Sequence, residues 1–141
     1  MTLEIALRVT GASLLALAAL HIFLPKRFQW REEFARVSLL NRQIFYVHCL
    51  FICLALVLMG VLCLVWPGAL LAPSLLGELV AAGLAVFWLF RLVAQWLIYD
   101  PQLWRGKPFE TFMHVVFTGL WIFYTVVFTT VWWVQRGALN G

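Results

Sequence analysis

The sequence has few charged residues for its length. Only 11% of its 141 residues are Asp, Glu, Lys or Arg, whereas 65% are hydrophobic and the mean hydropathy is +0.96. A water-soluble domain of this size could not bury so much apolar surface. The composition therefore excludes a soluble domain and predicts a membrane protein.

The apolar runs also lack the in-and-out alternation of membrane-spanning strands, which excludes a transmembrane β-barrel. Four continuous segments are long enough to cross a hydrocarbon core of about 30 Å as helices: residues 5–23, 43–66, 75–98 and 112–134. The first segment is not typical of a cleaved signal peptide, because basic residues follow it rather than precede it. We predict one transmembrane domain over residues 1–141, an all-α, up-down-up-down bundle of four helices.

No cysteine lies in a predicted loop, so a disulfide framework is excluded. Cys49, Cys53 and Cys63 all fall within the second segment, and we interpret them as small packing residues. Small residues on the first segment, Ala12, Ala16 and Ala19, share one helix face and are expected to let a neighbouring helix pack closely.

Positive charge is scarce on one side of the predicted bundle. The two loops on the other side carry seven basic residues: Lys26, Arg27, Arg31, Arg36, Arg42, Arg105 and Lys107. The opposite side has only Arg8 and Arg136. This imbalance predicts that both basic loops are cytoplasmic and both termini outside, with the inner membrane of a cell as the expected location. The basic residues suit contact with the lipid bilayer, and no nucleic-acid partner is implied.

The first basic loop has its own pattern. Trp30, Phe34 and Val37 recur at a spacing of four and three residues, with charged residues around the rest of the helix circumference. This spacing predicts a short amphipathic helix over residues 29–40, lying in the membrane interface.

Motifs that attach metal or haem are absent: there is no HxxxH, ExxH or CxxCH sequence. However, His21, His48 and His114 each lie about one turn inside a different predicted helix, at the same end of the bundle. Neutral imidazole is the commonest metal ligand, and helical bundles hold haem and metals through histidines on facing helices. We therefore predict His48 and His114 as the leading ligands of a metal ion, haem or another tetrapyrrole, with His21 as a third.

Other polar residues are expected near these histidines as a cofactor-binding set: Arg91, Gln95, Arg42 and Asn41. A polar stripe at helical spacing on the fourth segment should face the bundle interior: Glu110, His114, Thr118, Trp121 and Thr125. A second stripe at the same cytoplasmic end lies on the third segment: Trp88, Arg91, Gln95 and Tyr99. Arg91 lies about two turns inside its segment, where an unpaired guanidinium is costly. Its side chain either extends to the cytoplasmic interface or pairs with an acceptor, for which Asp100, Glu110 and a bound anion are the candidates.

These features support three functional hypotheses. The first is a cofactor-binding protein that acts as an electron-transfer component of a larger membrane complex. The second is a non-catalytic structural subunit, because eight Trp and twelve Phe favour assembly with other membrane subunits or further copies of the chain. The third is a lipid-binding or lipid-modifying protein that holds a head group at the polar residues. No motif identifies a reaction class, and the outer halves of the segments lack the polar residues of a conduction path.

Overall fold

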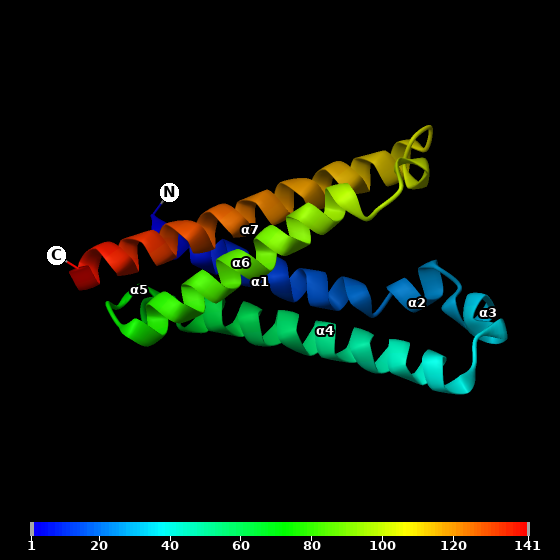
Figure 1. Ribbon diagram of the computed structural model, residues 1–141, viewed down its shortest axis with the longest axis horizontal. Helices are drawn as coiled ribbons and strands as arrows, with labels where there is room; N and C mark the ends of the chain where they lie inside the picture. Colours follow the sequence, from blue (N-terminus) through cyan, green and yellow to red (C-terminus); the bar gives the residue numbers. More distant parts are fainter. Residues whose placement is uncertain (1, 141) are drawn as a thin grey trace. The chain divides into compact units, whose positions relative to one another are not determined.

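The computed structural model describes residues 2–140, and its only regular secondary structure over that range is helical (Figure 1). Four helices are long and apolar enough to cross a membrane: α1 (Leu3–His21), α4 (Leu39–Val65), α6 (Leu75–Leu97) and α7 (Pro108–Asn140). The short helices between them are α2 (Leu24–Arg27), α3 (Trp30–Glu33), η1 (Phe34–Arg36), α5 (Pro67–Leu71) and η2 (Pro101–Leu103). The four predicted segments are confirmed as helices, and many large apolar side chains on them are exposed, as an integral membrane protein requires.

Local capping explains where the long helices begin. The Ser38 side chain accepts a hydrogen bond from the Asn41 backbone N–H at 3.4 Å, so α4 begins four residues earlier than predicted. Ser74 does the same for α6 through the Gly77 N–H at 3.0 Å. Pro108 occupies the first position of α7, where a missing N–H costs nothing.

The chain divides into two compact units, which are described separately. In the unit of residues 5–67, α1 and α4 run antiparallel and touch through small residues. A Cβ atom on Gly11 would lie 2.7 Å from both the Gly60 carbonyl oxygen and the Leu64 backbone nitrogen. Near this contact the Arg8 guanidinium donates to the Leu64 carbonyl oxygen at 3.1 Å. The two backbones can approach this closely only because Gly11 has no side chain.

The segment between α1 and α4 is not confirmed as one helix over residues 29–40. Within that range the chain forms α3 and η1, after which the backbone of Val37 is extended. Trp30 and Phe34 pack on Phe45 of α4, with ring centroids 4.8 and 4.6 Å apart. The apolar spacing therefore reflects aromatic side chains that anchor a broken segment on the start of α4.

The second unit comprises residues 68–140 together with residues 2–4, and it is built on the pair α6 and α7. These helices run alongside each other in opposite directions, joined by the loop that contains η2 (Figure 1). Their shared core contains the fully or nearly fully buried side chains of Trp88, Tyr124 and Phe128. This antiparallel hairpin brings the start of α7 beside the end of α6.

The far end of the hairpin is fixed by Gln135, which is only 1% exposed. Its side-chain amide nitrogen donates to the carbonyl oxygens of Leu70 and Ala72, and its amide oxygen accepts from the Ser74 N–H at 3.1 Å. One side chain thus satisfies three backbone groups, one in α5 and two in the connection from α5 to α6. Gly77 lies against this amide, since a Cβ there would be 2.6 Å from the Gln135 nitrogen.

Candidate functional site

The three predicted histidine ligands are divided between the units. His21 and His48 belong to the unit of residues 5–67, and His114 belongs to the other. The Nδ1 atoms of His21 and His48 each lie 2.8 Å from the carbonyl oxygen of the residue four positions earlier, Leu17 and Ile44. A carbonyl oxygen only accepts, so in the neutral ring Nδ1 carries the proton and Nε2 keeps its lone pair.

Asn41 and Arg42 lie in the first turn of α4, one to two turns before His48. The Asn41 side chain is exposed and that of Arg42 is half-buried. Neither side chain makes a hydrogen bond within residues 2–140. Over the same residues, no three His, Cys, Asp or Glu side chains form a group that could hold a metal ion.

The strongest polar cluster lies in the second unit and is centred on Gln95 of α6, which is buried. Its amide oxygen accepts hydrogen bonds from Arg91 at 3.2 Å and from the Trp121 indole at 3.3 Å, and its amide nitrogen lies 2.9 Å from His114 Nδ1. We call these four residues the Gln95 network. It joins the two polar stripes that the sequence predicts on the third and fourth segments, and it includes three of the predicted site residues.

The neighbouring groups determine how the Gln95 amide is oriented and which ring nitrogen of His114 carries the proton. The Arg91 guanidinium and the Trp121 indole can only donate, so the Gln95 oxygen must face them and its NH₂ group must face His114. Because the NH₂ group donates, His114 Nδ1 accepts, and the proton of the neutral ring lies on Nε2. His114 therefore has the opposite tautomer from His21 and His48.

Arg91 is half-buried, and aromatic rings hold its guanidinium. The guanidinium carbon lies 4.7 Å from the centre of the Trp121 ring and 5.7 Å from that of Tyr99. Of the predicted acceptors, Asp100 instead caps η2, accepting from the Gln102 N–H at 2.8 Å. The partners of Arg91 in the described part of the chain are thus one amide oxygen and two rings, with no carboxylate.

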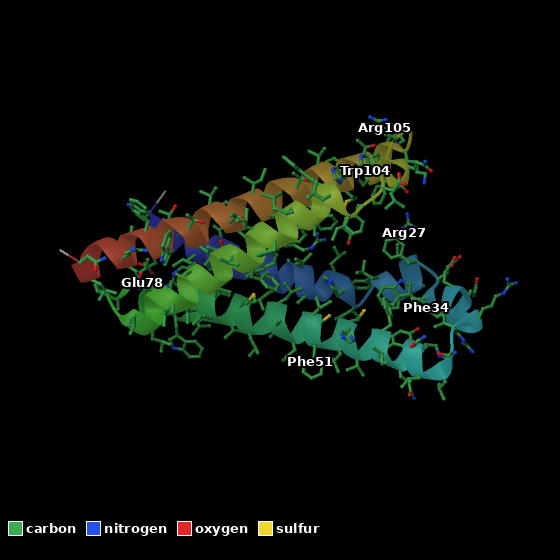
Figure 2. All side chains as sticks on the ribbon, viewed as in Figure 1. Arg27, Phe34, Phe51, Glu78, Trp104 and Arg105 are labelled. Carbon is green, nitrogen blue, oxygen red and sulfur yellow. The ribbon has the colours of Figure 1, made fainter. Side chains whose placement is uncertain are left out.

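Trp104 completes the cluster from the loop between α6 and α7. Its ring stacks on the His114 imidazole at 3.9 Å with an interplanar angle of 11°. The Thr111 hydroxyl donates to its carbonyl oxygen at 2.7 Å and so holds the loop against α7. Figure 2 shows Trp104 together with Arg105 at this loop, whereas Glu78 lies toward the opposite end of α6. Sequence reasoning missed Trp104, whose only signal was a tryptophan in a turn-rich segment.

Aromatic rings of α6 and α7 pack against one another next to the Gln95 network. Trp88 stacks on Trp121 at 5.2 Å and meets Tyr124 edge-on at 4.7 Å. The Trp88 indole N–H and the Thr118 hydroxyl are both buried and have no hydrogen-bond partner among residues 2–140. Two buried polar groups at this end of the hairpin are thus left without a partner in the described residues, which is uncommon in folded proteins.

Comparison of the chain with protein-family models, with curated proteins and with solved structures found no match in any of the three. The class that the fold defines is a small integral membrane protein with four apolar helices. Its function has to be inferred from the side chains themselves.

Proposed function

We propose that this membrane protein binds the anionic head group of an amphiphile at the Gln95 network, with Arg91 as the charged anchor. The observation that carries this function is the environment of Arg91, which within residues 2–140 has amide and ring partners but no carboxylate. A guanidinium inside a membrane-spanning helix is costly without a counter-ion. A phosphate or carboxylate in the lipid would supply that charge and form paired hydrogen bonds with the guanidinium.

The surroundings of Arg91 favour tight recognition. The Trp121 ring and the Gln95 oxygen both contact the guanidinium, so less side-chain freedom is left to lose on binding. Only one terminal nitrogen is used by Gln95, which leaves the rest of the guanidinium fork for oxygen acceptors. A bound lipid needs no enclosed cavity, because its acyl chains remain in the bilayer.

The location of the site follows from the charge pattern. In an up-down-up-down bundle with cytoplasmic basic loops, the loop between α6 and α7 would face the cytoplasm with Arg105 and Lys107. Anionic lipids are enriched on that side of the membrane and are attracted by basic residues near the surface. Both termini would then lie outside an inner membrane.

Exchange of Arg91 for glutamine tests this function. In nanodiscs of mixed phosphatidylglycerol and phosphatidylcholine, the wild-type protein is expected to retain phosphatidylglycerol preferentially when it is released and analysed by native mass spectrometry. The Arg91→Gln variant should lose about tenfold in this preference, because a charged hydrogen-bond donor is removed. Arg91→Lys should be intermediate, because a lysine keeps the charge but loses the planar fork.

Arg136 provides a matched control, since its guanidinium also lies over a tryptophan, Trp132, at 5.5 Å. It is exposed and near the C-terminal end of α7. Arg136→Gln should leave lipid preference unchanged. Equal retention of the two lipids by the wild-type protein would exclude the proposed function.

A second candidate, binding of a metal ion, haem or another tetrapyrrole, is favoured by the tautomers of His21 and His48. Their hydrogen bonds leave Nε2 as an available ligand atom. In the Gln95 network His114 has its only free nitrogen protonated, so His21 and His48 are the better ligand pair. With such a cofactor, the protein would act in electron transfer within a larger membrane complex.

A reduced-minus-oxidised absorption spectrum of protein purified from its native membrane tests this second candidate. Haem ligation predicts Soret and α bands that His21→Ala and His48→Ala abolish and His114→Ala retains. A featureless spectrum would exclude haem. If lipid preference were also absent, the hypothesis of a structural subunit that assembles with other membrane proteins or further copies would replace both.

A further inference from the structure

His114 presents an unused hydrogen-bond donor within the Gln95 network. Its Nδ1 is occupied by the Gln95 amide, and its ring is held flat against Trp104. The remaining ring nitrogen, Nε2, then carries a proton, and it has no acceptor among residues 2–140. The imidazole is half-buried, and its Nε2 is not among the buried side-chain atoms that lack a partner, so this N–H is accessible from outside the protein.

The His114 and Arg91 side chains are positioned by the same group. Arg91 binds the oxygen of the Gln95 amide at 3.2 Å, and His114 binds its nitrogen at 2.9 Å. Because the two amide atoms belong to one planar group, the two side chains are separated by a single amide. A small anion bound between them would accept hydrogen bonds from both side chains through different oxygens.

All the unused polar atoms of these two side chains are donors. A ligand that meets them must supply oxygen acceptors in more than one direction. A carboxylate and a phosphodiester each have two terminal oxygens, and a paired interaction with the guanidinium occupies both. A phosphate monoester has a third terminal oxygen available to His114.

On the basis of the proposed function, we propose that His114 is the specificity-determining residue of the site and selects a phosphate monoester head group. Arg91 takes two of the phosphate oxygens, and His114 Nε2–H donates to the third. Gln95 acts as a positioning residue that sets the His114 tautomer. The ligand is either a phospholipid with a terminal phosphate or a soluble phosphate monoester.

The first test compares phosphatidic acid, which has a monoester phosphate, with phosphatidylglycerol and oleate in nanodiscs of phosphatidylcholine. The wild-type protein should retain phosphatidic acid about tenfold better than the other two anions. His114→Phe keeps an aromatic ring for Trp104 to stack on but removes the donor. It should abolish the advantage of phosphatidic acid over phosphatidylglycerol.

Two further variants complete this experiment. His114→Gln retains an N–H donor on a side chain of similar length and should restore part of the phosphatidic acid preference. His48→Phe changes an exposed histidine of the other unit and should have no effect. Displacement of phosphatidic acid by inorganic phosphate would identify a soluble phosphate monoester as the ligand, whereas resistance to displacement would identify the lipid.

The tautomer provides a readout that is independent of lipid binding. In ¹⁵N-histidine-labelled protein, at a pH where the rings are neutral, long-range ¹H–¹⁵N couplings should show a protonated Nε2 on His114 and a protonated Nδ1 on His21 and His48. Loss of one signal set in His114→Gln assigns the spectrum. A protonated Nδ1 on His114, or equal retention of all three anions, would overturn the role of His114. Arg91 would still bind anions if the phosphatidylglycerol preference remained.

Discussion

Replacement of Gly11 by valine is expected to force α1 away from α4. Even the first side-chain atom would lie 2.7 Å from the backbone of Gly60 and Leu64, and a backbone cannot yield as a flexible side chain can. Overpacking of this kind costs up to about 3 kcal/mol. Cys63 reports the result, because it is completely buried and shares a face of α4 with Gly60 and Leu64. In a Cys49→Ser/Cys53→Ser background, a maleimide should label Cys63 at least tenfold faster in Gly11→Val.

Gly83 is the matched control for Gly11. It also lies inside a long helix, α6, but a Cβ there would meet no atom within 4 Å. Gly83→Val carries the same change in helix propensity without the collision, so it should leave Cys63 protected. Slow labelling of Cys63 in Gly11→Val would show that the contact between α1 and α4 is not as close as described.

Replacement of Gln135 by leucine is expected to give the second large effect. The change would leave the carbonyl oxygens of Leu70 and Ala72 and the Ser74 N–H without their partner. Of these hydrogen bonds, the one to Leu70 is buried and the other two are part-buried. A buried backbone group without a partner costs about 1–3 kcal/mol, so we expect a total loss of about 3 kcal/mol. An unfolding titration of the purified protein in mixed detergent, followed by tryptophan fluorescence, would measure this loss.

Limited proteolysis would locate the effect of Gln135→Leu. The connection through Leu70 to Ser74 should be cleaved before the rest of the chain unfolds, because Gln135 is what fixes it to α7. Gln43→Leu is the control, since Gln43 is also helical but exposed. An unchanged unfolding midpoint for Gln135→Leu would mean that these three hydrogen bonds do not stabilise the hairpin.

The polar stripes explain why part of the candidate site could be predicted. Arg91 and Gln95 are four residues apart on one helix face, and His114 lies on a similarly narrow polar face of the next helix. Polar faces of neighbouring apolar helices tend to meet, because polar groups in lipid find partners inside the protein. In the Gln95 network, residues of these two stripes are in contact.

Other features depended on details that helical periodicity does not encode. Gln135 lies just beyond the predicted end of the last segment, and nothing in its neighbours signals three backbone partners. The small-residue stripe Ala12, Ala16 and Ala19 is exposed, whereas Gly11 meets α4. Rotation of one helix against another is set by the shape of both, so the first helix alone could not reveal the contact face.

The division of the histidines could not be predicted for a similar reason. Histidines at the same depth in the membrane need not be neighbours, because depth does not determine which helices lie next to each other in a bundle. The local hydrogen bonds decide instead what each ring can do, and they differ: His21 and His48 bond to their own helices, whereas His114 accepts from Gln95. Three residues that look equivalent in the sequence thus have different available atoms.

The length of α7 has a consequence for where in a cell this protein can reside. Its 33 residues span about 50 Å, well beyond a hydrocarbon core of about 30 Å. Because α6 and α7 are joined at both ends, through Gln95 to His114 and through Ser74 to Gln135, they must tilt or shift together. Mismatch between helix length and bilayer thickness sorts proteins among membranes. The thickness of the bilayer would therefore determine how deep Arg91 lies in the membrane. The protein should partition into bilayer regions where the Arg91 side chain reaches the head groups.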